Sequence, residues 1–289
     1  MRVHREGTLL DLRKVFTAPG VPRRLISAGA GLLGRIPVPK FMRRKLWGFS
    51  ARRLGIDQEE VPGDLRDYRN FLALFTRPLP EGARPLPEGD AWLSPADGRV
   101  VAATRVTSEG TWLIKGTPYT SRELVPGGDV RLLAGYQALQ IYLAPYNYHR
   151  YHAPCDMTIL EAVTEPGELQ PVDPSLVRRS MRVLATNKRI LLHCQAADGT
   201  PFSMLFVGAL NVGGMSFLHD DTLGKNPLIE GRRVYEPTPT VARGAELGWF
   251  EFGSTVVLFA PGQRIPLKAE GEACRAREPL LAGTLRESN

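Results

Sequence analysis

Short runs of apolar and β-branched residues, separated by turn residues, dominate the chain from Trp92 onward. They are GRVVAATRV (98–106), TWLIKG (111–116), ALQIYLAP (138–145), RILLHCQA (189–196), FSMLFVGAL (202–210) and STVVLFA (254–260). Each run has the length and the residue types of a β-strand, and the last ends at Pro261-Gly262. The pattern therefore predicts a β-rich body with a sandwich or barrel-like arrangement.

Helical periodicity is confined to the N-terminal part of the chain. Leu9, Leu12 and Phe16 recur at the spacing of one helical face, and a short helical pattern covers residues 68–75 before a Pro/Gly-rich connector. We therefore expect an α+β protein made of a helical segment, residues 1–62, and a β-rich catalytic domain, residues 63–289.

Positive charge is concentrated in the same N-terminal part. Residues 1–56 hold 13 Lys/Arg and 2 Asp/Glu, a net charge of +11, whereas the whole chain carries +7. The stretch KFMRRKLWGFSARRLGI mixes Phe41, Trp47 and Phe49 with basic residues, as interfacial membrane anchors do. No apolar run approaches the roughly 18 residues of a spanning helix. The pattern predicts basic amphipathic helices that dock on an anionic membrane rather than on nucleic acid; packed helices with a solvated basic side are the alternative.

The cysteines and histidines do not form a metal site by their spacing. Cys155, Cys194 and Cys274 are far apart and form no CxxC pair, which disfavours a disulfide framework and suits a reducing compartment. His149 and His152 are three residues apart, but no HExxH motif or Cys/His companion accompanies them. We expect no metal.

Three stretches at the edges of predicted strands carry the candidate chemistry. They are SPADGRV (94–100), YLAPYNYHRYHAP (142–154) and FGST (252–255). Taken singly, Asp97-Gly98 reads as a turn and Gly253-Ser254 as a bulge entering a strand. Taken together, Asp97, His152 and Ser254 supply the orienting group, the base and the nucleophile of a catalytic triad. The serine is not in a GxSxG motif, so the hydrolase nucleophile elbow is absent.

Six motifs in order resemble those of phosphatidylserine decarboxylase proenzymes. They are SPADGRV, IKGTPYT, YLAPYNYHRYHAP, LATNKR, VGALNVGGM and FEFGSTVVLF, spread over roughly residues 60–265. The basic N-terminus is similar to the membrane-docking segment of the bacterial enzymes. Phe252 stands where many members have leucine, which changes a packing residue and no reacting atom.

The resemblance implies self-cleavage between Gly253 and Ser254. Asp97 would orient His152, and His152 would deprotonate Ser254, whose oxygen attacks the Gly253 carbonyl. The products would be a β chain, 1–253, and an α chain, 254–289, that stay associated. Residue 254 would become a pyruvoyl group, the covalent cofactor.

The resemblance also implies the reaction of the mature enzyme. The pyruvoyl group would form a Schiff base with the amine of phosphatidylserine and accept electrons as CO2 leaves. His149 would return a proton, giving phosphatidylethanolamine in phospholipid biosynthesis. The enzyme would work as a peripheral protein at the cytoplasmic face of the cell membrane, and the sequence is compatible with a homodimer.

Three other functions stay open on the residues alone. A serine hydrolase would use Asp97, His152 and Ser254 with the chain intact. A pyruvoyl decarboxylase of a soluble amino acid would not need the basic lipophilic arm. A non-catalytic β-rich lipid-binding protein would not need the three catalytic residue types.

Overall fold

The computed structural model describes most of the chain from Leu32 to Ala282. The described ranges are 32–108, 110–114, 117–128, 134–168, 170, 182–209, 214–225, 228–251 and 254–282. The predicted helical face of Leu9, Leu12 and Phe16 lies outside these ranges, as does Gly253.

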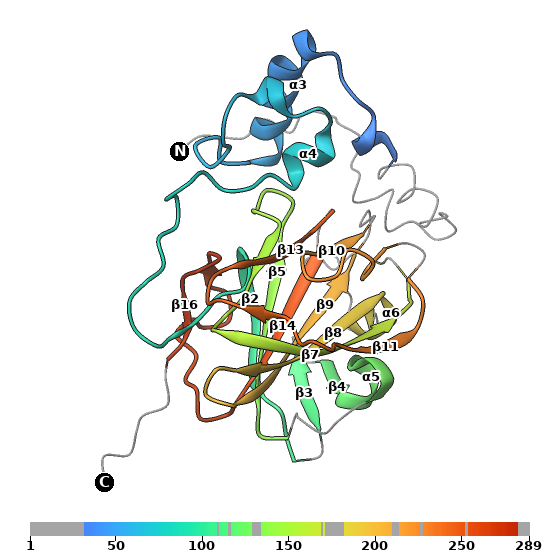
Figure 1. The fold of residues 1–289 in the computed structure, drawn as a ribbon, viewed down its shortest axis with the longest axis vertical. Helices are drawn as coiled ribbons and strands as arrows, with labels where there is room; N and C mark the ends of the chain where they lie inside the picture. The colour runs from blue at the N-terminus through green and yellow to red at the C-terminus, as the bar shows by residue number, and fades with distance from the viewer. Residues whose placement is uncertain are drawn as a thin grey trace.

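A nine-stranded antiparallel sheet forms the centre of the molecule (Figure 1). Its strand order is open, running from an edge at β11 to an edge at β15. In that order the strands are β11 (Gly231–Val234), β7 (Met157–Glu165), β8 (Arg189–Ala196), β9 (Pro201–Gly208), β14 (Ser254–Ala260), β5 (Gln137–Leu143), β2 (Gly98–Arg105) and β15 (Ala273–Cys274), and β12 (Thr240–Val241) also pairs with β7. The predicted β-rich fold is confirmed.

Smaller sheets and short helices accompany the large sheet. The strands are β10 (Met215–Phe217), β13 (Glu246–Phe250) and β6 (Arg150–His152) in one sheet, β1 (Trp92–Leu93) with β16 (Pro279–Leu281), and β3 (Thr111–Ile114) with β4 (Thr117–Thr120). The short helices of this part are α5 (Ser121–Leu124), η2 (Pro126–Gly128) and α6 (Val183–Thr186). Because all the strand pairs of these sheets are antiparallel, none of them requires the helical crossover of a parallel pair, and the helices of the body are short.

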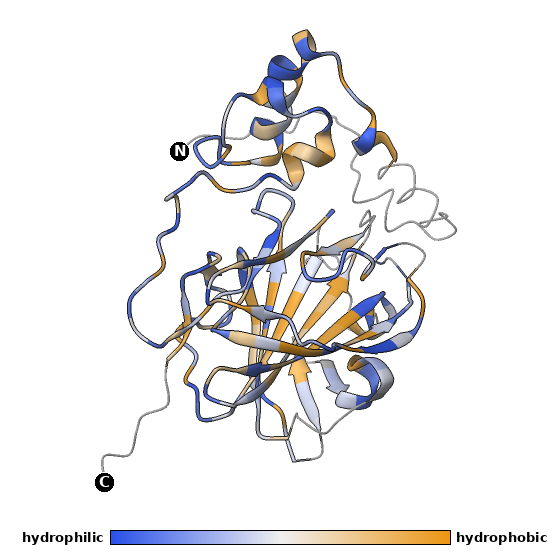
Figure 2. Cartoon of the chain, in the orientation of Figure 1, coloured by the Kyte–Doolittle hydropathy of each residue, from blue (hydrophilic) through white to orange (hydrophobic). Residues whose placement is uncertain are grey.

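Strand β14 is buried on both faces, which explains its continuous apolar run from Val256 to Ala260. All seven of its residues are buried. Val256 and Leu258 belong to a core shared with the β10–β13–β6 sheet, and Val257 and Phe259 belong to a second core shared with β3, β4, α5 and α6. Side chains alternate between the faces of a strand, so a strand between two cores carries apolar residues on both faces. Figure 2 shows this band of apolar strands.

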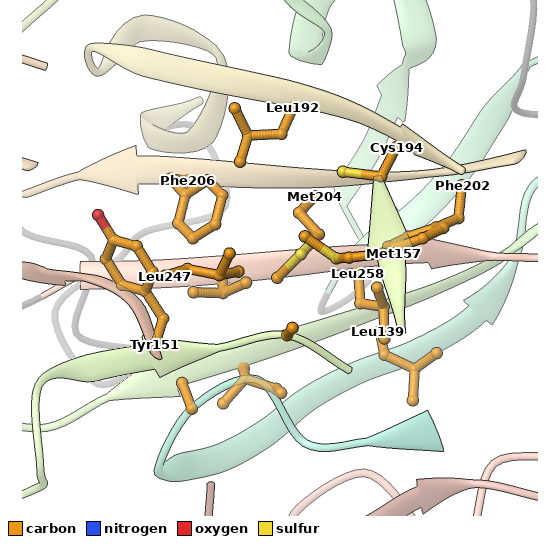
Figure 3. Close-up of a cluster of buried hydrophobic side chains, with 14 of the residues drawn as sticks. Leu139, Tyr151, Met157, Leu192, Cys194, Phe202, Met204, Phe206, Leu247 and Leu258 are labelled. Carbon is orange, nitrogen blue, oxygen red and sulfur yellow. The ribbon is translucent and has the colours of Figure 1, made fainter. Parts of the chain in front are cut away.

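The core between the large sheet and the β10–β13–β6 sheet is rich in aromatic and sulfur-containing side chains. Tyr151 of β6 packs edge-on against Phe250, and its ring lies 4.5 Å from that of Phe206 on β9, measured between centroids. Figure 3 shows Tyr151 and Leu247 facing Phe206, Met204 and Leu258 across this core. The packing fixes β6 and β13 over one face of the large sheet.

A helical cap, which we define as residues 32–75, sits at one end of the sheets (Figure 1). It contains α3 (Lys40–Leu54), η1 (Leu65–Asp67) and α4 (Phe71–Phe75). Trp47 is 3% exposed, and its Nε1 donates a hydrogen bond to the Tyr68 carbonyl at 2.8 Å. The expected boundary after residue 62 lies within the cap.

The structure separates the apolar residues of the cap into two groups. Trp47 and Ala51 pack into its core, so the expectation that Trp47 is a membrane residue is corrected. Phe41 and Phe49 are 83% and 61% exposed. Other exposed apolar side chains of the cap are Leu32, Leu33, Ile36, Met42 and Leu46. No helix in the described ranges is both long enough and apolar enough to cross a bilayer.

Candidate active site

Ser254 is the first residue of β14 and lies between two strands of the large sheet. Its register partners are Leu143 of β5 and Gly208 of β9. By alternation its side chain shares a face with Val256 and Leu258, the face covered by the β10–β13–β6 sheet. Ser254 is fully buried, and its Oγ has no hydrogen-bond partner among the described residues. A buried hydroxyl without a partner is costly, which marks this atom for a role other than packing.

His152 is held in one tautomer by two neighbours. Its Nδ1 lies 3.0 Å from the carbonyl oxygen of Gly244, which can only accept, so Nδ1 carries the proton. Its Nε2 then accepts from the hydroxyl of Tyr148, also at 3.0 Å. Burial lowers the pKa of His152 to about 4, with nearby arginines adding to the effect. The ring is thus a neutral base with its lone pair on Nε2.

Asp97 is bound to an arginine rather than to a histidine. Both of its carboxylate oxygens accept from Arg84, whose Nη2 also binds Glu60, and Oδ1 accepts the backbone N–H of Ala276 at 2.8 Å. The Arg84 guanidinium in turn lies 5.5 Å from the centroid of the Tyr148 ring. Asp97 therefore connects to His152 through Arg84 and Tyr148.

The two hydrogen bonds of the expected triad are not formed in this structure. The Gly244 carbonyl takes the place at Nδ1 that was expected for Asp97. Tyr151 points into the core between the sheets, so the next residue, His152, points to the opposite side of β6. Ser254 faces the core, and the side chains of His152 and Ser254 are therefore on different sides of β6. The roles of Asp97, His152 and Ser254 remain predictions.

His149 lies in the loop that leaves β5 just after Leu143, the partner of Ser254. Its Nδ1 donates to the Asn147 carbonyl at 2.8 Å, and its own carbonyl accepts from the backbone of Phe250 at the end of β13. The ring is fully buried against Phe75 of α4, at 4.0 Å between centroids, and its Nε2 has no partner in the described part of the chain. Burial lowers the pKa of His149 to about 3.

Comparison with known proteins decides between the open functions. Residues 71–282 match the family model for phosphatidylserine decarboxylase. The chain belongs to this family. The match spans the sheets and every candidate catalytic residue.

Curated relatives within the phosphatidylserine decarboxylase family align over most of their length. The protein named phosphatidylserine decarboxylase proenzyme in Helicobacter pylori (strain Shi470) is 34% identical over 224 residues, 76% of this chain and 83% of its own. The proteins of the same name in Anaeromyxobacter sp. (strain K) and Halorhodospira halophila are each 36% identical, over 90% and 83% of this chain and 94% and 82% of their own. The serine hydrolase alternative finds no support among them.

Ser254 fits the prosthetic group that a decarboxylase of this family implies. A pyruvoyl group made from residue 254 has a methyl group in place of the serine CH2OH and a ketone at Cα in place of the backbone nitrogen. The surroundings of Oγ are fully buried and no described residue is hydrogen-bonded to it, so an apolar methyl group is accommodated there without loss of a hydrogen bond. The residues present therefore fit a pyruvoyl group.

Sequence reasoning missed a basic residue close to the candidate cleavage site of this decarboxylase. Lys188 is 3% exposed, and its side chain lies across Gly208, the register partner of Ser254. A Cβ at Gly208 would sit 2.8 Å from Cγ of Lys188, so glycine is needed there. Burial lowers the pKa of Lys188 to about 8. The motif LATNKR contains this lysine, but Lys188 and Ser254 are far apart in the sequence. Nothing in the sequence therefore indicated that Lys188 packs on Gly208, the strand neighbour of Ser254.

Two further residues of the site, Arg84 and Tyr148, were also overlooked. Arg84 lies in the Pro/Gly-rich connector, where a lone charge normally indicates a solvated loop. In the structure Arg84 is 8% exposed and binds Asp97. Tyr148 belongs to the YLAPYNYHRYHAP motif, beside His149. Its hydroxyl lies 3.0 Å from His152 Nε2 only because the loop after β5 folds back on itself.

Proposed function

We propose that this member of the phosphatidylserine decarboxylase family cleaves itself between Gly253 and Ser254 and then converts phosphatidylserine to phosphatidylethanolamine and CO2. The observation that carries the proposal is the fully buried Ser254 Oγ, which has no described partner, at the start of a central strand. The name proenzyme borne by the curated relatives supports a processed chain.

Self-cleavage begins with attack of the Ser254 Oγ on the Gly253 carbonyl carbon. The Oγ proton is passed to the Ser254 nitrogen, the C–N bond breaks and an ester forms. Loss of the Cα proton then expels the Gly253 carboxylate and leaves a carbon–carbon double bond in residue 254. Addition of water and loss of ammonia complete the pyruvoyl group. Each bond broken is matched by one formed, and no oxidant is needed.

His152 is the base that we assign to the serine proton. Its tautomer is suited to the role, because Nε2 carries the lone pair while Nδ1 donates to Gly244. The proton reaches Nε2 through the Tyr148 hydroxyl, which already contacts it. Asp97 stabilises this arrangement at a distance, through Arg84 and the Tyr148 ring.

In the mature enzyme the pyruvoyl ketone supplies an attachment point for the substrate amine and a sink for the electron pair released with CO2. His149 handles the proton that the substrate carbon must regain. Because its pKa lies far below 7 and Nδ1 donates to Asn147, its Nε2 is a free acceptor at neutral pH. We assign to His149 the transfer of a proton to the substrate carbon after CO2 has left.

The exposed apolar residues of the cap dock the enzyme on the membrane that holds its substrate. Phe41 and Phe49 project from α3, and Arg44 and Lys45 of the same helix are exposed as well. Apolar insertion combined with attraction to anionic lipid is the usual mode of peripheral binding. This assignment puts the cytoplasmic leaflet, which is anionic, within reach of the site.

Intact-mass measurement after denaturation tests the proposal. The wild-type chain should yield a 36-residue fragment, residues 254–289, whose N-terminus is a pyruvoyl group and resists Edman degradation. Ser254→Ala should remain one chain of 289 residues. An intact wild-type chain with a free Ser254 would contradict the proposal, and so would a fragment that begins with an ordinary serine.

A further inference from the structure

Arg77, just after α4, is a buried cation for which the described part of the chain supplies no hydrogen-bonding anion. The residue is 1% exposed, and neither Nε nor Nη1 of its guanidinium has a partner among the described residues. Burial lowers the pKa of Arg77, but an arginine side chain stays protonated in proteins. A buried charge that lacks a counter-ion at hydrogen-bond distance is among the costliest features a fold can carry.

The other buried arginines of the described ranges show what Arg77 lacks. Arg84 binds Asp97 and Glu60, and Arg189 binds Glu165 and two backbone carbonyls. Arg264 lies 3.8 Å from the carboxylate of Asp198 and 4.3 Å above the Trp92 ring. Although Glu60 and Asp97 exert some attraction on Arg77, their oxygens are hydrogen-bonded to Arg84.

Arg77 also lies close to the proposed proton donor of the decarboxylation. The ring of its near neighbour Phe75 packs in a tilted orientation against His149, with 4.0 Å between centroids, and the intervening Thr76 carbonyl accepts from Arg150 at 2.9 Å. The guanidinium is near enough to His149 to lower its pKa. Among the described residues, Nε and Nη1 of Arg77 and Nε2 of His149 are thus buried polar atoms without hydrogen-bond partners, and the loop with His149 begins just after Leu143, the register partner of Ser254.

We propose that Arg77 binds the phosphodiester of the phosphatidylserine headgroup, an inference that rests on the proposed function. The planar guanidinium donates two parallel hydrogen bonds to phosphate or carboxylate oxygens. The substrate carboxylate is the less suitable partner, because it loses its charge as CO2 leaves and a bound arginine would stabilise the ground state most. The phosphodiester keeps its charge in substrate and product.

The bound phosphodiester has a consequence for His149. It neutralises the Arg77 charge, which raises the pKa of His149 from its low value in the free protein. His149 thus holds a proton more readily when the substrate is in place than when the site is empty. Arg77 would in this way couple headgroup binding to proton transfer.

Titration calorimetry on the uncleaved Ser254→Ala chain tests the proposal without relying on self-cleavage. One probe is glycerophosphoethanolamine, which has a phosphodiester and no carboxylate. The other is L-serine, which has a carboxylate and no phosphodiester. Arg77→Met should weaken glycerophosphoethanolamine binding at least about tenfold and leave L-serine binding unchanged. Arg77→Lys should give an intermediate loss. Arg69→Met, at an exposed arginine of the neighbouring cap, is the matched control and should change neither.

Thermal unfolding of the same variants separates ligand binding from a structural role. Without ligand, Arg77→Met should leave Tm unchanged or raise it, because it removes an unpaired buried charge. A fall in Tm would show that protein groups already use the guanidinium and would overturn the proposal. So would unchanged phosphodiester binding, a loss confined to L-serine, or no saturable phosphodiester binding by the Ser254→Ala parent. A wild-type chain that fails to cleave would instead count against the proposed function.

Discussion

The hydroxyl oxygen of Tyr148 lies 3.0 Å from Nε2 of His152, the one ring nitrogen that can accept a proton. The opposite ring nitrogen donates to Gly244, so the bond with Tyr148 is a donation from the hydroxyl. Any proton that reaches this histidine in the described state must therefore displace the tyrosine or pass through it.

Tyr148→Phe tests which route the proton takes. The variant should fold but self-cleave at least about tenfold more slowly, because the relay is lost and the buried Nε2 has no partner. Gel-resolved cleavage time courses after synthesis are the measurement. Tyr146→Phe is the control, since Tyr146 is 47% exposed in the same loop. Unchanged cleavage in Tyr148→Phe would mean that His152 reaches Ser254 without the tyrosine.

The two histidines of the loop should separate maturation from catalysis. His152→Ala should abolish self-cleavage because Ser254 loses its base. His149→Ala should still be cleaved, yet release CO2 from phosphatidylserine at least about a hundredfold more slowly, because proton transfer by a placed side chain contributes factors of this size. Cleavage by mass and CO2 release from labelled lipid are measured on the same preparations. If the His149→Ala enzyme were cleaved and fully active, the proposed role of His149 in proton transfer would be wrong.

Stability should depend on pH through the same pair. Folding lowers the pKa of His149 to about 3 and of His152 to about 4 from an ordinary 6.5, in both cases mainly by burial. Below pH 6.5 the unfolded chain binds protons that the folded chain does not. The free energy of unfolding should therefore fall as pH drops from 6.5 towards 4, by up to about 1.4 kcal/mol per pH unit for each histidine.

Urea denaturation of the Ser254→Ala chain at pH 7.5, 5.5 and 4.5 measures this dependence. His149→Gln in that background should reduce the slope by one histidine's share. A slope that the substitution leaves unchanged would show that other groups cause the loss of stability.

Membrane binding should follow the exposed residues of α3 and not the buried one. Replacing Phe41 and Phe49 by serine should reduce flotation with anionic liposomes, with less than about 1 kcal/mol change in stability, because both side chains are exposed. Trp47→Ala should instead cost about 3–5 kcal/mol of stability, because its ring is buried. Equal flotation of the double variant and wild type would rule out docking through these residues.

The basic residues of α3 need the same distinction. Arg43 donates to the carbonyls of Val38 and Arg66 at 2.7 and 2.9 Å, so its removal would disturb the cap. Neutralising Arg44 and Lys45, which are exposed, isolates the contribution of charge. Flotation of this variant should fall most at low salt, where attraction to the surface is least screened.

Local sequence signals identified the strands, but not how the strands meet. The apolar run 254–260 is a strand because both of its faces are covered, and six predicted strands have counterparts in the structure. The order β9–β14–β5 joins segments far apart in the chain, and no local pattern encodes such pairings. The prediction that Trp47 contacts the membrane was wrong, because an aromatic residue on a basic helix can face either the lipid or the protein interior, and the sequence does not distinguish the two.

The candidate site shows the same division between the proposed catalytic residues and their surroundings. Asp97, His149, His152 and Ser254 were predicted from motifs, since their residue types are tied to the proposed chemistry. Their partners Arg84 and Tyr148 contact them only after the chain folds. Arg77 gave no signal either, because its significance lies in the absence of a described partner, which only packing reveals.

The position of β14 determines whether the proposed self-cleavage can occur before or only after the chain has folded. The strand that starts the α chain is hydrogen-bonded along its length to β5 and β9, both of which belong to the β chain. If the chain were cut before β14 had paired with both neighbours, the free α chain would have to insert between β5 and β9. Those two strands could by then have paired with each other. Assembly must therefore be finished before scission, and the two products, once pulled apart by denaturant, should not regain activity on mixing.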